Sequence, residues 1–407
     1  MANLRTRDVA LLTSPAGLAL AAALPPYADA DALGLAQRLR AQGHDPDLIA
    51  LTLTQSRLRA RATGKLGVLA DRLLLTPDGL EQATRPALAA RHAARFVAAG
   101  VERVLDLGCG LGLDALAFAQ AGLFVDGVDA DPATAALAAH NLASHPGARA
   151  TAGPAEQALA GLRRDPKRLG VWFDPARRTP GRTDAIGRTR RVFALDQISP
   201  SWEFVRQTAM AVPATGAKLS PGFPHASIPP DSEAEWVSFD GEVLECALWW
   251  GQLVERPGRS ATVLRRDGSA FRIWQAELPG LDRSVSPGDV TSGRPPAPGD
   301  YLYDPDRAVV RAGLVGALVA RTGGAQIGPD AGYVVSPDCL DVPWARRFVV
   351  LETLPATSKA IRAWARATGT GRMTIKKRGS RIDPDRLRRS LKLDGSGTEA
   401  TIVLTAH

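Results

Sequence analysis

The segment that most constrains the fold covers residues 104–114 and reads VLDLGCGLGLD. An apolar run ends in Asp106, a helical pattern begins at Ala115, and between them stand three glycines at alternate positions: Gly108, Gly110 and Gly112. Glycine lets the backbone take a positive φ and lets a ligand lie against the main chain, while the N–H groups of the following helix point at the same place. The pattern therefore predicts an α/β protein that holds a nucleotide-like ligand at this turn.

The glycine spacing and two acidic residues narrow the choice of ligand. A dinucleotide turn reads G-x-G-x-x-G, and here Leu113 stands where its third glycine would be. Asp106 at the strand end would repel a pyrophosphate and attract an amino group. A second apolar run ends in Asp129, roughly 20 residues past the glycines, where α/β proteins hold a ribose diol. The turn thus favours a ligand that carries both a ribose and an amino-acid moiety.

Cysteine, histidine and apolar patterns exclude several classes of protein. The three cysteines are dispersed and form no C-x-x-C pair, which indicates a reducing compartment and no disulfide framework. The six histidines form no H-E-x-x-H motif, so we expect no metal site. No run reaches the roughly 18 apolar residues of a membrane span. Ser14-Pro15 reads as the start of a helix rather than as part of a signal peptide, so we expect a cytoplasmic protein.

The net charge of +8 is concentrated in two zones. Residues 356–392 carry twelve Lys and Arg against two acids, and residues 163–191 carry ten against three, so the rest of the chain is net acidic. A mildly acidic body with two basic zones indicates a polyanionic partner, most simply nucleic acid. For either zone taken alone, a solvated basic surface is the alternative.

The order of apolar patterns predicts four domains. Residues 1–100 read as a helical domain, with one helix from Thr76 to Ala99, and residues 101–255 alternate strand and helix as in a doubly wound sheet. Residues 256–330 are expected to form a small ferredoxin-like α+β connector, and residues 331–407 a basic α+β domain. The last domain is expected to hold strands over residues 347–352, 372–376 and 400–405 and helices over residues 358–368 and 383–390.

A second motif, DPARR over residues 174–178, follows the fourth strand of the expected sheet. Active sites of α/β proteins lie at the carboxyl ends of parallel strands. The Asp174 carboxylate and the Pro175 carbonyl can accept the two hydrogens of an exocyclic amine, which leaves the lone pair of the nitrogen free to attack a methyl group. Amino-group methyltransferases continue with a second proline and an aromatic residue, where this chain has Ala176 and Arg177. A guanidinium can stack on a base or bind phosphate.

Together these motifs resemble those of the class I S-adenosylmethionine-dependent methyltransferases. The stretch MTIKKRG over residues 373–379, with Asp383-Pro384 and Leu391-Lys392-Leu393, is similar to bacterial members that carry a C-terminal THUMP-like domain and are distantly trimethylguanosine synthase-like. The resemblance implies a Rossmann-like seven-strand core with S-adenosylmethionine as cofactor. It also implies RNA as the substrate class, because true THUMP domains bind RNA, typically tRNA.

The motifs and the resemblance give three sets of candidate residues. The cofactor set is Asp106, Gly108, Gly110, Gly112, Asp129 and Glu156. The acceptor set is Asp174, Pro175 and Arg177. The RNA-binding set is Lys376, Lys377, Arg378, Arg381, Arg388 and Arg389. Because Trp364 is the one aromatic residue in that basic zone, phosphate and shape contacts are expected there rather than base stacking.

We therefore predict an S-adenosylmethionine-dependent methyltransferase that acts on a base of tRNA or rRNA, with an exocyclic amine as one candidate acceptor. Two alternatives stay open. The altered motif at residues 174–178 is consistent with a nucleic-acid-binding protein whose methyltransferase fold does not catalyse. A methyltransferase for a small molecule or a protein would leave the basic zones as incidental surface.

Overall fold

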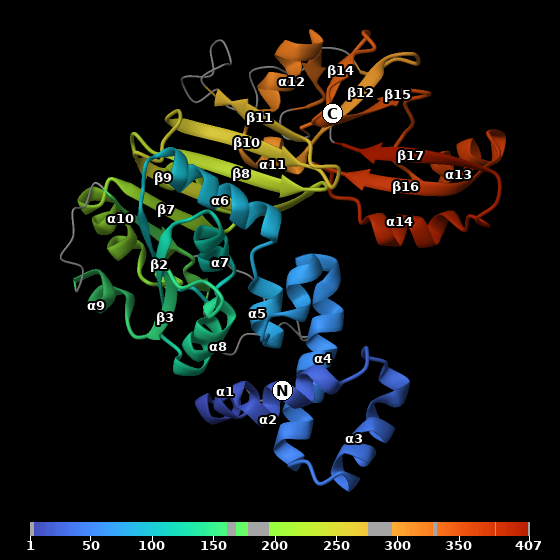
Figure 1. The fold of residues 1–407 in the computed structure, drawn as a ribbon. Helices are drawn as coiled ribbons and strands as arrows, with labels where there is room; N and C mark the ends of the chain where they lie inside the picture. The colour runs from blue at the N-terminus through green and yellow to red at the C-terminus, as the bar shows by residue number, and fades with distance from the viewer. Residues whose placement is uncertain are drawn as a thin grey trace. The chain divides into compact units, whose positions relative to one another are not determined.

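The computed structural model describes residues 4–160, 168–177, 195–275, 295–328, 332–378 and 380–405 of the chain. It separates into two compact units, which we describe one at a time (Figure 1). The first unit comprises Met1–Leu219 and Leu248–Glu255, and the second comprises Ser220–Ala247 and Arg256–His407. Among the described residues, none of the helices has the length and apolar character that crossing a bilayer requires.

The first unit begins with helices, as the sequence predicts. Their bounds are α1 Thr6–Thr13, α2 Pro15–Ala23, α3 Ala32–Ala41, α4 Pro46–Leu66, α5 Pro77–Gln82 and α6 Pro86–Ala98. The side chain of Ser14 caps α2, with Pro15 in its first turn. The predicted single helix from Thr76 to Ala99 is wrong, because the chain divides it into α5 and α6. Pro86 starts the second piece, since its ring has no N–H to donate and clashes with a preceding helical turn.

A parallel sheet follows in the first unit. Its strands are β1 Arg103–Leu107, β2 Phe124–Asp129, β3 Ala148–Ala152, β4 Leu169–Phe173 and β7 Ala214–Leu219, in the order β3-β2-β1-β4-β7. The intervening helices are α7 Leu113–Gln120, α8 Pro132–Leu142, α9 Ala155–Ala160 and α10 Trp202–Ala211. Two short strands, β5 Ala176–Arg177 and β6 Ile198–Ser199, pair with each other. Because β1 lies between β2 and β4, the chain order reverses there, which is where open α/β sheets bind ligands.

The strands of the second unit form three further groups. Their bounds are β8 Glu233–Phe239, β9 Glu242–Gly251, β10 Gly258–Leu264, β11 Ala270–Trp274, β12 Tyr301–Pro305, β13 Ala325–Gln326, β14 Val334–Ser336, β15 Ala345–Val349, β16 Thr370–Lys377 and β17 Thr398–Leu404. The groups have the orders β11-β10-β8-β9, β13-β14-β12-β15 and β16-β17. The helices are α11 Arg307–Arg311, α12 Val315–Thr322, α13 Ser358–Ala367 and α14 Pro384–Leu391. Strand β9 passes into the first unit at Leu248.

Two expectations about the middle of the chain differ from this structure. Among the described residues, 256–330 do not build a ferredoxin-like sheet of their own: β10 pairs with β8, and β12 pairs with β14 and β15. The predicted boundary at residue 330 therefore falls inside one four-stranded sheet. Strands β10 and β11 form an antiparallel hairpin around Asp267-Gly268, a dipeptide that favours a tight turn. Local patterns of this kind do not show with which distant strands an element pairs.

The basic C-terminal region follows its predicted element order. Strands β16 and β17 run parallel, and helices α13 and α14 lie beside them in Figure 1. Each helix has one apolar face, and the core buried there consists of Ile361, Leu387, Leu391 and Leu404. The other faces carry exposed Lys and Arg residues, as expected of amphipathic surface helices, except that Arg362 is half-buried and donates to the carbonyl of Ser390.

Candidate active site

The glycine turn has the backbone conformation that its sequence predicts. Gly108, Gly110 and Gly112 all have positive φ, at 88°, 55° and 79°. The N–H groups of Gly108 and Cys109 donate to the carbonyl of Val128, at 2.8 and 3.1 Å, which ties the turn to β2. A Cβ on Gly108 would lie 2.7 Å from the carbonyl oxygen of Asp174, whereas a Cβ on Gly110 would meet nothing within 4 Å. The turn therefore brings the two predicted motifs into direct contact.

Asp129 is fixed at the carboxyl end of β2 by the backbone. One of its carboxylate oxygens accepts the N–H of Gly110 at 3.1 Å, and the other accepts the N–H of Asp131 at 2.9 Å. Each oxygen of an ionised carboxylate can accept more than one hydrogen bond. The Asp129 carboxylate is therefore oriented and can still accept hydroxyl groups from a ligand.

One cavity of about 230 Å³ brings most of the cofactor and acceptor candidates together. Six of its lining residues were predicted from the sequence: Gly108, Gly110, Asp129, Glu156, Asp174 and Pro175. Gly112 is not among the lining residues, because it stands at the start of α7 and packs toward Ala138 and Leu142 of α8. The backbone of Arg177 lies in β5, but its side chain is outside what the structure describes, as is Arg178.

Asp106 is not among the residues that line this cavity. The residue is 1% exposed, and neither carboxylate oxygen has a hydrogen-bond partner in the described part of the chain. Burial raises the pKa of Asp106 well above its ordinary value, and the nearby charges of Asp114, Asp174 and Asp129 raise it further. The charge of Lys218 opposes this rise only in part, and a cationic ligand in the cavity would favour the ionised form of Asp106 further.

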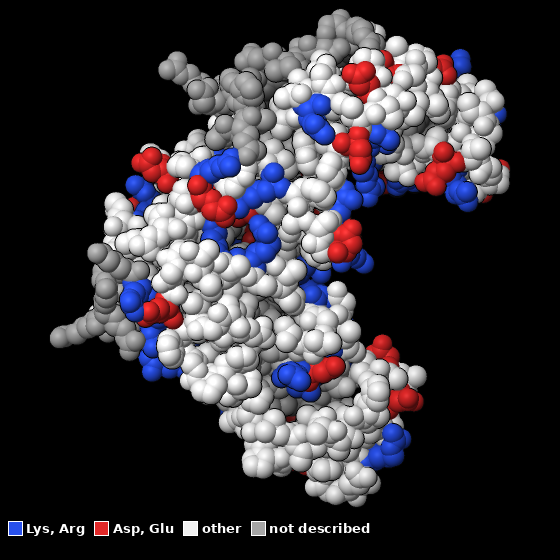
Figure 2. All heavy atoms as spheres, turned by 45° about the horizontal axis from the view of Figure 1, so that its top comes forward, with Lys and Arg blue, Asp and Glu red and all other residues white. Residues whose placement is uncertain are grey.

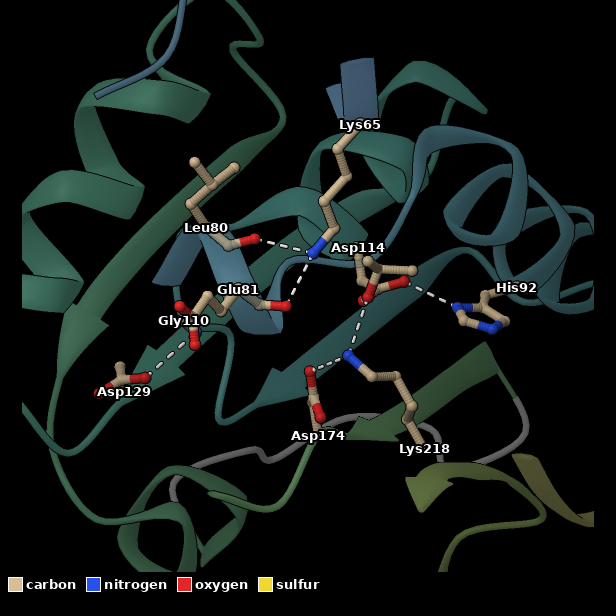
Figure 3. A network of polar contacts seen from close by, with 10 residues as sticks. Lys65, Leu80, Glu81, His92, Gly110, Asp114, Asp129, Asp174 and Lys218 are labelled. Atoms are coloured by element: carbon tan, nitrogen blue, oxygen red, sulfur yellow. Dashed lines mark hydrogen bonds and ion pairs between the residues drawn. The ribbon is translucent and has the colours of Figure 1, made fainter. Parts of the chain in front are cut away.

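A chain of polar contacts leads away from Asp174, and the sequence did not predict it (Figure 3). The ammonium group of Lys218, at the end of β7, donates to Asp174 at 2.5 Å and to the hydroxyl of Thr84 at 2.9 Å. That hydroxyl donates to Asp114 of α7 at 2.6 Å, and Asp114 also pairs with Nδ1 of His92 in α6 at 2.7 Å. These four contacts join residues that are between 22 and 134 positions apart in the sequence, so no local motif signals them.

Asp114 and His92, which end this series of polar contacts, are buried and carry charge. Burial by itself would raise the pKa of Asp114, but the charge and hydrogen bond of His92, together with Lys218 and Thr84, outweigh burial and lower it. The ring of His92 packs against Trp172 of β4, with centroids 4.4 Å apart. Asp114 is therefore a fixed anion that anchors Thr84, and through Thr84 it anchors Lys218.

The RNA-binding candidates of the second unit fall into two groups. Lys376 and Arg378 both contact the buried carboxylate of Asp304, at 2.6 and 2.7 Å, and Arg378 also lies over the ring of Tyr333. The other four candidates, Lys377, Arg381, Arg388 and Arg389, are exposed. Arg388 pairs with its neighbour Asp385 at 3.0 Å. The basic zone at residues 163–191 lies mostly outside the described residues.

The close approach at Gly108 gives a testable prediction. We expect Gly108→Ala to lower the free energy of unfolding by about 1–3 kcal/mol, because the methyl group would meet the Asp174 carbonyl and the φ of 88° is strained for alanine. Gly110→Ala is the matched control, since its φ is also positive but its Cβ meets nothing within 4 Å. Urea unfolding of both variants measures the difference. Equal losses of stability would contradict the close contact.

The comparisons with known proteins agree with this geometry. A model of the THUMP domain-like family matches residues 345–407, and a model of a domain of unknown function (DUF8688) matches residues 5–62. Proteins from two Mycobacterium tuberculosis strains, CDC 1551 / Oshkosh and ATCC 25618 / H37Rv, are each described as an uncharacterized S-adenosylmethionine-dependent methyltransferase. Each is 35% identical to this chain over 377 residues, which cover 90% of this chain and 94% of the relative.

A solved structure shows the same fold. A protein from Porphyromonas gingivalis W83 that is described as a methyltransferase matches with a TM-score of 0.70 and 20% identity, over 94% of this chain and 97% of its own. The α/β methyltransferase fold, the THUMP-like region, the enzyme class and the cofactor expected from the sequence are thereby confirmed. The chain belongs to the S-adenosylmethionine-dependent methyltransferases, with S-adenosylmethionine as its cofactor and a THUMP-like region over residues 345–407.

Proposed function

We propose that this methyltransferase acts on a base of RNA, and that the acceptor nitrogen is held by Asp174 and Pro175. The observation that carries the proposal is the single cavity that both motifs line. Gly108, Gly110 and Asp129 form one part of its wall, and Asp174 and Pro175 form another. A methyl donor bound at the glycine turn would therefore stand next to an acceptor at the end of β4.

The residues at the glycine turn fit the cofactor. Asp129 would accept the ribose hydroxyls, because its oxygens are already oriented by two backbone N–H groups. The open space beside Gly110 leaves room for a ligand against the main chain. Glu156 is an exposed carboxylate on the same cavity wall. Asp106 is buried and does not line the cavity, so it would act through its charge, since the bound cofactor carries a positive sulfonium and supplies an electrophilic methyl group.

The acceptor side supplies position rather than strong base catalysis. An exocyclic amine on a base is a weak nucleophile, because its lone pair is delocalised into the ring. The Asp174 carboxylate and the Pro175 carbonyl would accept the two N–H hydrogens and aim the lone pair at the methyl group. After transfer, the nitrogen carries an extra proton that the Asp174 carboxylate accepts. Holding both reactants in one cavity supplies much of the rate enhancement.

The exposed basic residues of the THUMP-like region are the proposed contacts to RNA. On the face shown in Figure 2, basic and acidic side chains are interspersed among the described residues. For RNA binding, which cations are accessible therefore matters more than how many Lys and Arg residues the region contains. Lys377, Arg381 and Arg389 are exposed on or beside β16 and α14. Lys376 and Arg378 are held by Asp304 and have a structural role in this proposal. Cationic side chains of this kind bind the phosphate backbone.

The proposal is tested by comparing modified nucleosides. Mass spectrometry of total RNA from wild-type and deletion strains is expected to show one methylated nucleoside that the deletion strain lacks. The purified protein should restore that nucleoside when it is given S-adenosylmethionine and RNA from the deletion strain. Labelled methyl transfer to protein or to small molecules, with none to RNA, would refute the proposal. Fractionation should recover the protein with the cytoplasm, where we place it.

The two groups of basic residues make different predictions. Lys377→Ala and Arg389→Ala are each expected to weaken RNA binding and to lower the salt-dependence slope by about 1, because each removes a phosphate contact. Lys376→Ala is the matched control from the same strand and should lower thermal stability, because it leaves the buried carboxylate of Asp304 with one fewer cation. Filter binding at several salt concentrations and thermal unfolding measure the two effects. A salt slope that stays unchanged in Lys377→Ala and Arg389→Ala would exclude these contacts.

A further inference from the structure

Lys218 occupies a position that neither the motifs nor the comparisons assign. Its ammonium group donates to Asp174 at 2.5 Å and to Thr84 at 2.9 Å, and its side chain is 13% exposed. Thr84, Asp174 and Asp114 line the cavity, whereas Lys218 does not. Lys218 therefore contacts two residues that line the cavity without lining it itself, and any effect on the acceptor passes through Asp174, which its ammonium group reaches in Figure 3.

Several carboxylates crowd around this lysine. Asp174 follows β4, Asp106 lies on β1, Asp114 on α7 and Asp129 at the end of β2. The charges of Asp114, Asp174 and Asp129 act against ionisation of Asp106, and Lys218 is the cation that opposes them. Two further titratable groups face this cluster: His92 of α6, which contacts Asp114, and the buried thiol of Cys109 in the glycine turn, whose pKa is raised by burial and by the charges of Asp106, Asp129 and Asp174. Carboxylates that lie close together disfavour one another's ionisation unless a cation lies among them.

We propose that Lys218 is a positioning residue for methyl transfer. Thr84 holds its ammonium group, and the buried pair of Asp114 and His92 holds Thr84. The ammonium keeps the Asp174 carboxylate ionised and orients it to accept a hydrogen bond from the N–H of the methyl acceptor. The inference rests on the proposed function of Asp174. It adds that the pH range of activity is set by a residue that touches neither the cofactor nor the acceptor.

The test replaces Lys218 in the full-length protein and follows activity against pH. Lys218→Met keeps the length of the side chain and removes its charge. We expect kcat to fall and the acid limb of the pH profile to move up by about 1 unit or more, because Asp174 loses an opposite charge within 4 Å. The affinity for S-adenosylmethionine, measured by calorimetry, should change much less than kcat, because Lys218 does not line the cavity. Lys218→Arg should restore the acid limb, because a guanidinium keeps the charge.

A pair of Thr84 variants and one control variant separate a positioning role from general damage to the protein. Thr84→Val removes the hydroxyl that holds Lys218 and should shift the acid limb in the same direction by less, whereas Thr84→Ser should not. This pair carries the test if Lys218→Met fails to fold. Arg206→Met removes an exposed cation on α10 and should leave the profile as in the wild type. A fall in kcat that is equal at every pH in Lys218→Met would overturn the proposal.

The proposal can fail separately from the proposed function. If the wild-type protein methylates no RNA, the ionisation of Asp174 is followed directly, by NMR of protein labelled with ¹³C at the aspartate carboxyl carbons. The signal of Asp174 is the one that Asp174→Asn lacks. A midpoint that moves to higher pH in Lys218→Met supports the role of Lys218 whatever the substrate. An unmoved midpoint overturns it, even if RNA methylation is confirmed.

Discussion

Asp174→Asn is expected to lower methyl transfer to RNA by about 10²-fold to 10⁴-fold while S-adenosylmethionine still binds. The amide keeps the shape of the carboxylate but has an N–H donor in place of one oxygen. It therefore cannot both accept a hydrogen bond from the substrate amine and take up the proton that this amine releases after transfer. Asp174 and Pro175 line the same cavity as the glycine turn and Asp129, but in the proposed function they contact the acceptor, whereas the glycine turn and Asp129 hold the cofactor. The loss should therefore appear in kcat and not in the affinity for the cofactor.

Single-turnover transfer of a labelled methyl group and calorimetry of cofactor binding measure the two quantities. Glu203→Gln is the matched control, because it neutralises an exposed carboxylate of α10 in the same unit. It should change neither quantity. Full activity in Asp174→Asn would place the acceptor elsewhere, and a parallel loss of cofactor affinity would make Asp174 part of the cofactor site.

The parts of the molecule that local sequence could predict are those fixed by neighbouring residues. Positive φ at alternate glycines, a Ser cap followed by Pro, and the alternation of apolar residues act within one turn or strand, so the glycine turn and α13, α14, β16 and β17 follow from the sequence. The break at Pro86 was also local and could have been recognised from proline alone. Helix boundaries of this kind depend on one side chain.

What local sequence could not predict are pairings made over long distances. Lys218 meets Thr84 across 134 positions of sequence, and Lys376 meets Asp304 across 72. An isolated Lys beside a strand end, or within a basic run, looks the same whether it faces solvent or a buried carboxylate. The sequence therefore predicted six equivalent RNA contacts, and the structure distinguishes two that are held internally from four that are exposed.

The buried carboxylates Asp106 and Asp114 are expected to affect stability with opposite dependence on pH. The pKa of Asp106 is raised, so the folded protein holds a proton that the unfolded chain releases above about pH 4. Asp106 therefore costs stability that grows as pH rises from that value, by up to about 1.4 kcal/mol per pH unit until the folded pKa is passed. The pKa of Asp114 is lowered, so it contributes stability above about pH 4 that is lost as pH falls through the folded pKa.

Asp106→Asn should consequently gain stability relative to the wild type, and the gain should widen from pH 4 upward, while Asp114→Asn should lose stability by an amount that shrinks toward acid pH. Urea unfolding at a series of pH values measures both curves.

The same ionisation connects stability to function, because a cationic cofactor favours the ionised form of Asp106. Binding of S-adenosylmethionine should release a proton from the wild type and none from Asp106→Asn, as calorimetry in buffers of different ionisation enthalpy would record. Equal proton release from the wild type and from Asp106→Asn would show that the ionisation of Asp106 is not coupled to the cavity. Stability curves of both variants that keep the pH dependence of the wild type would show that neither carboxylate has a shifted pKa.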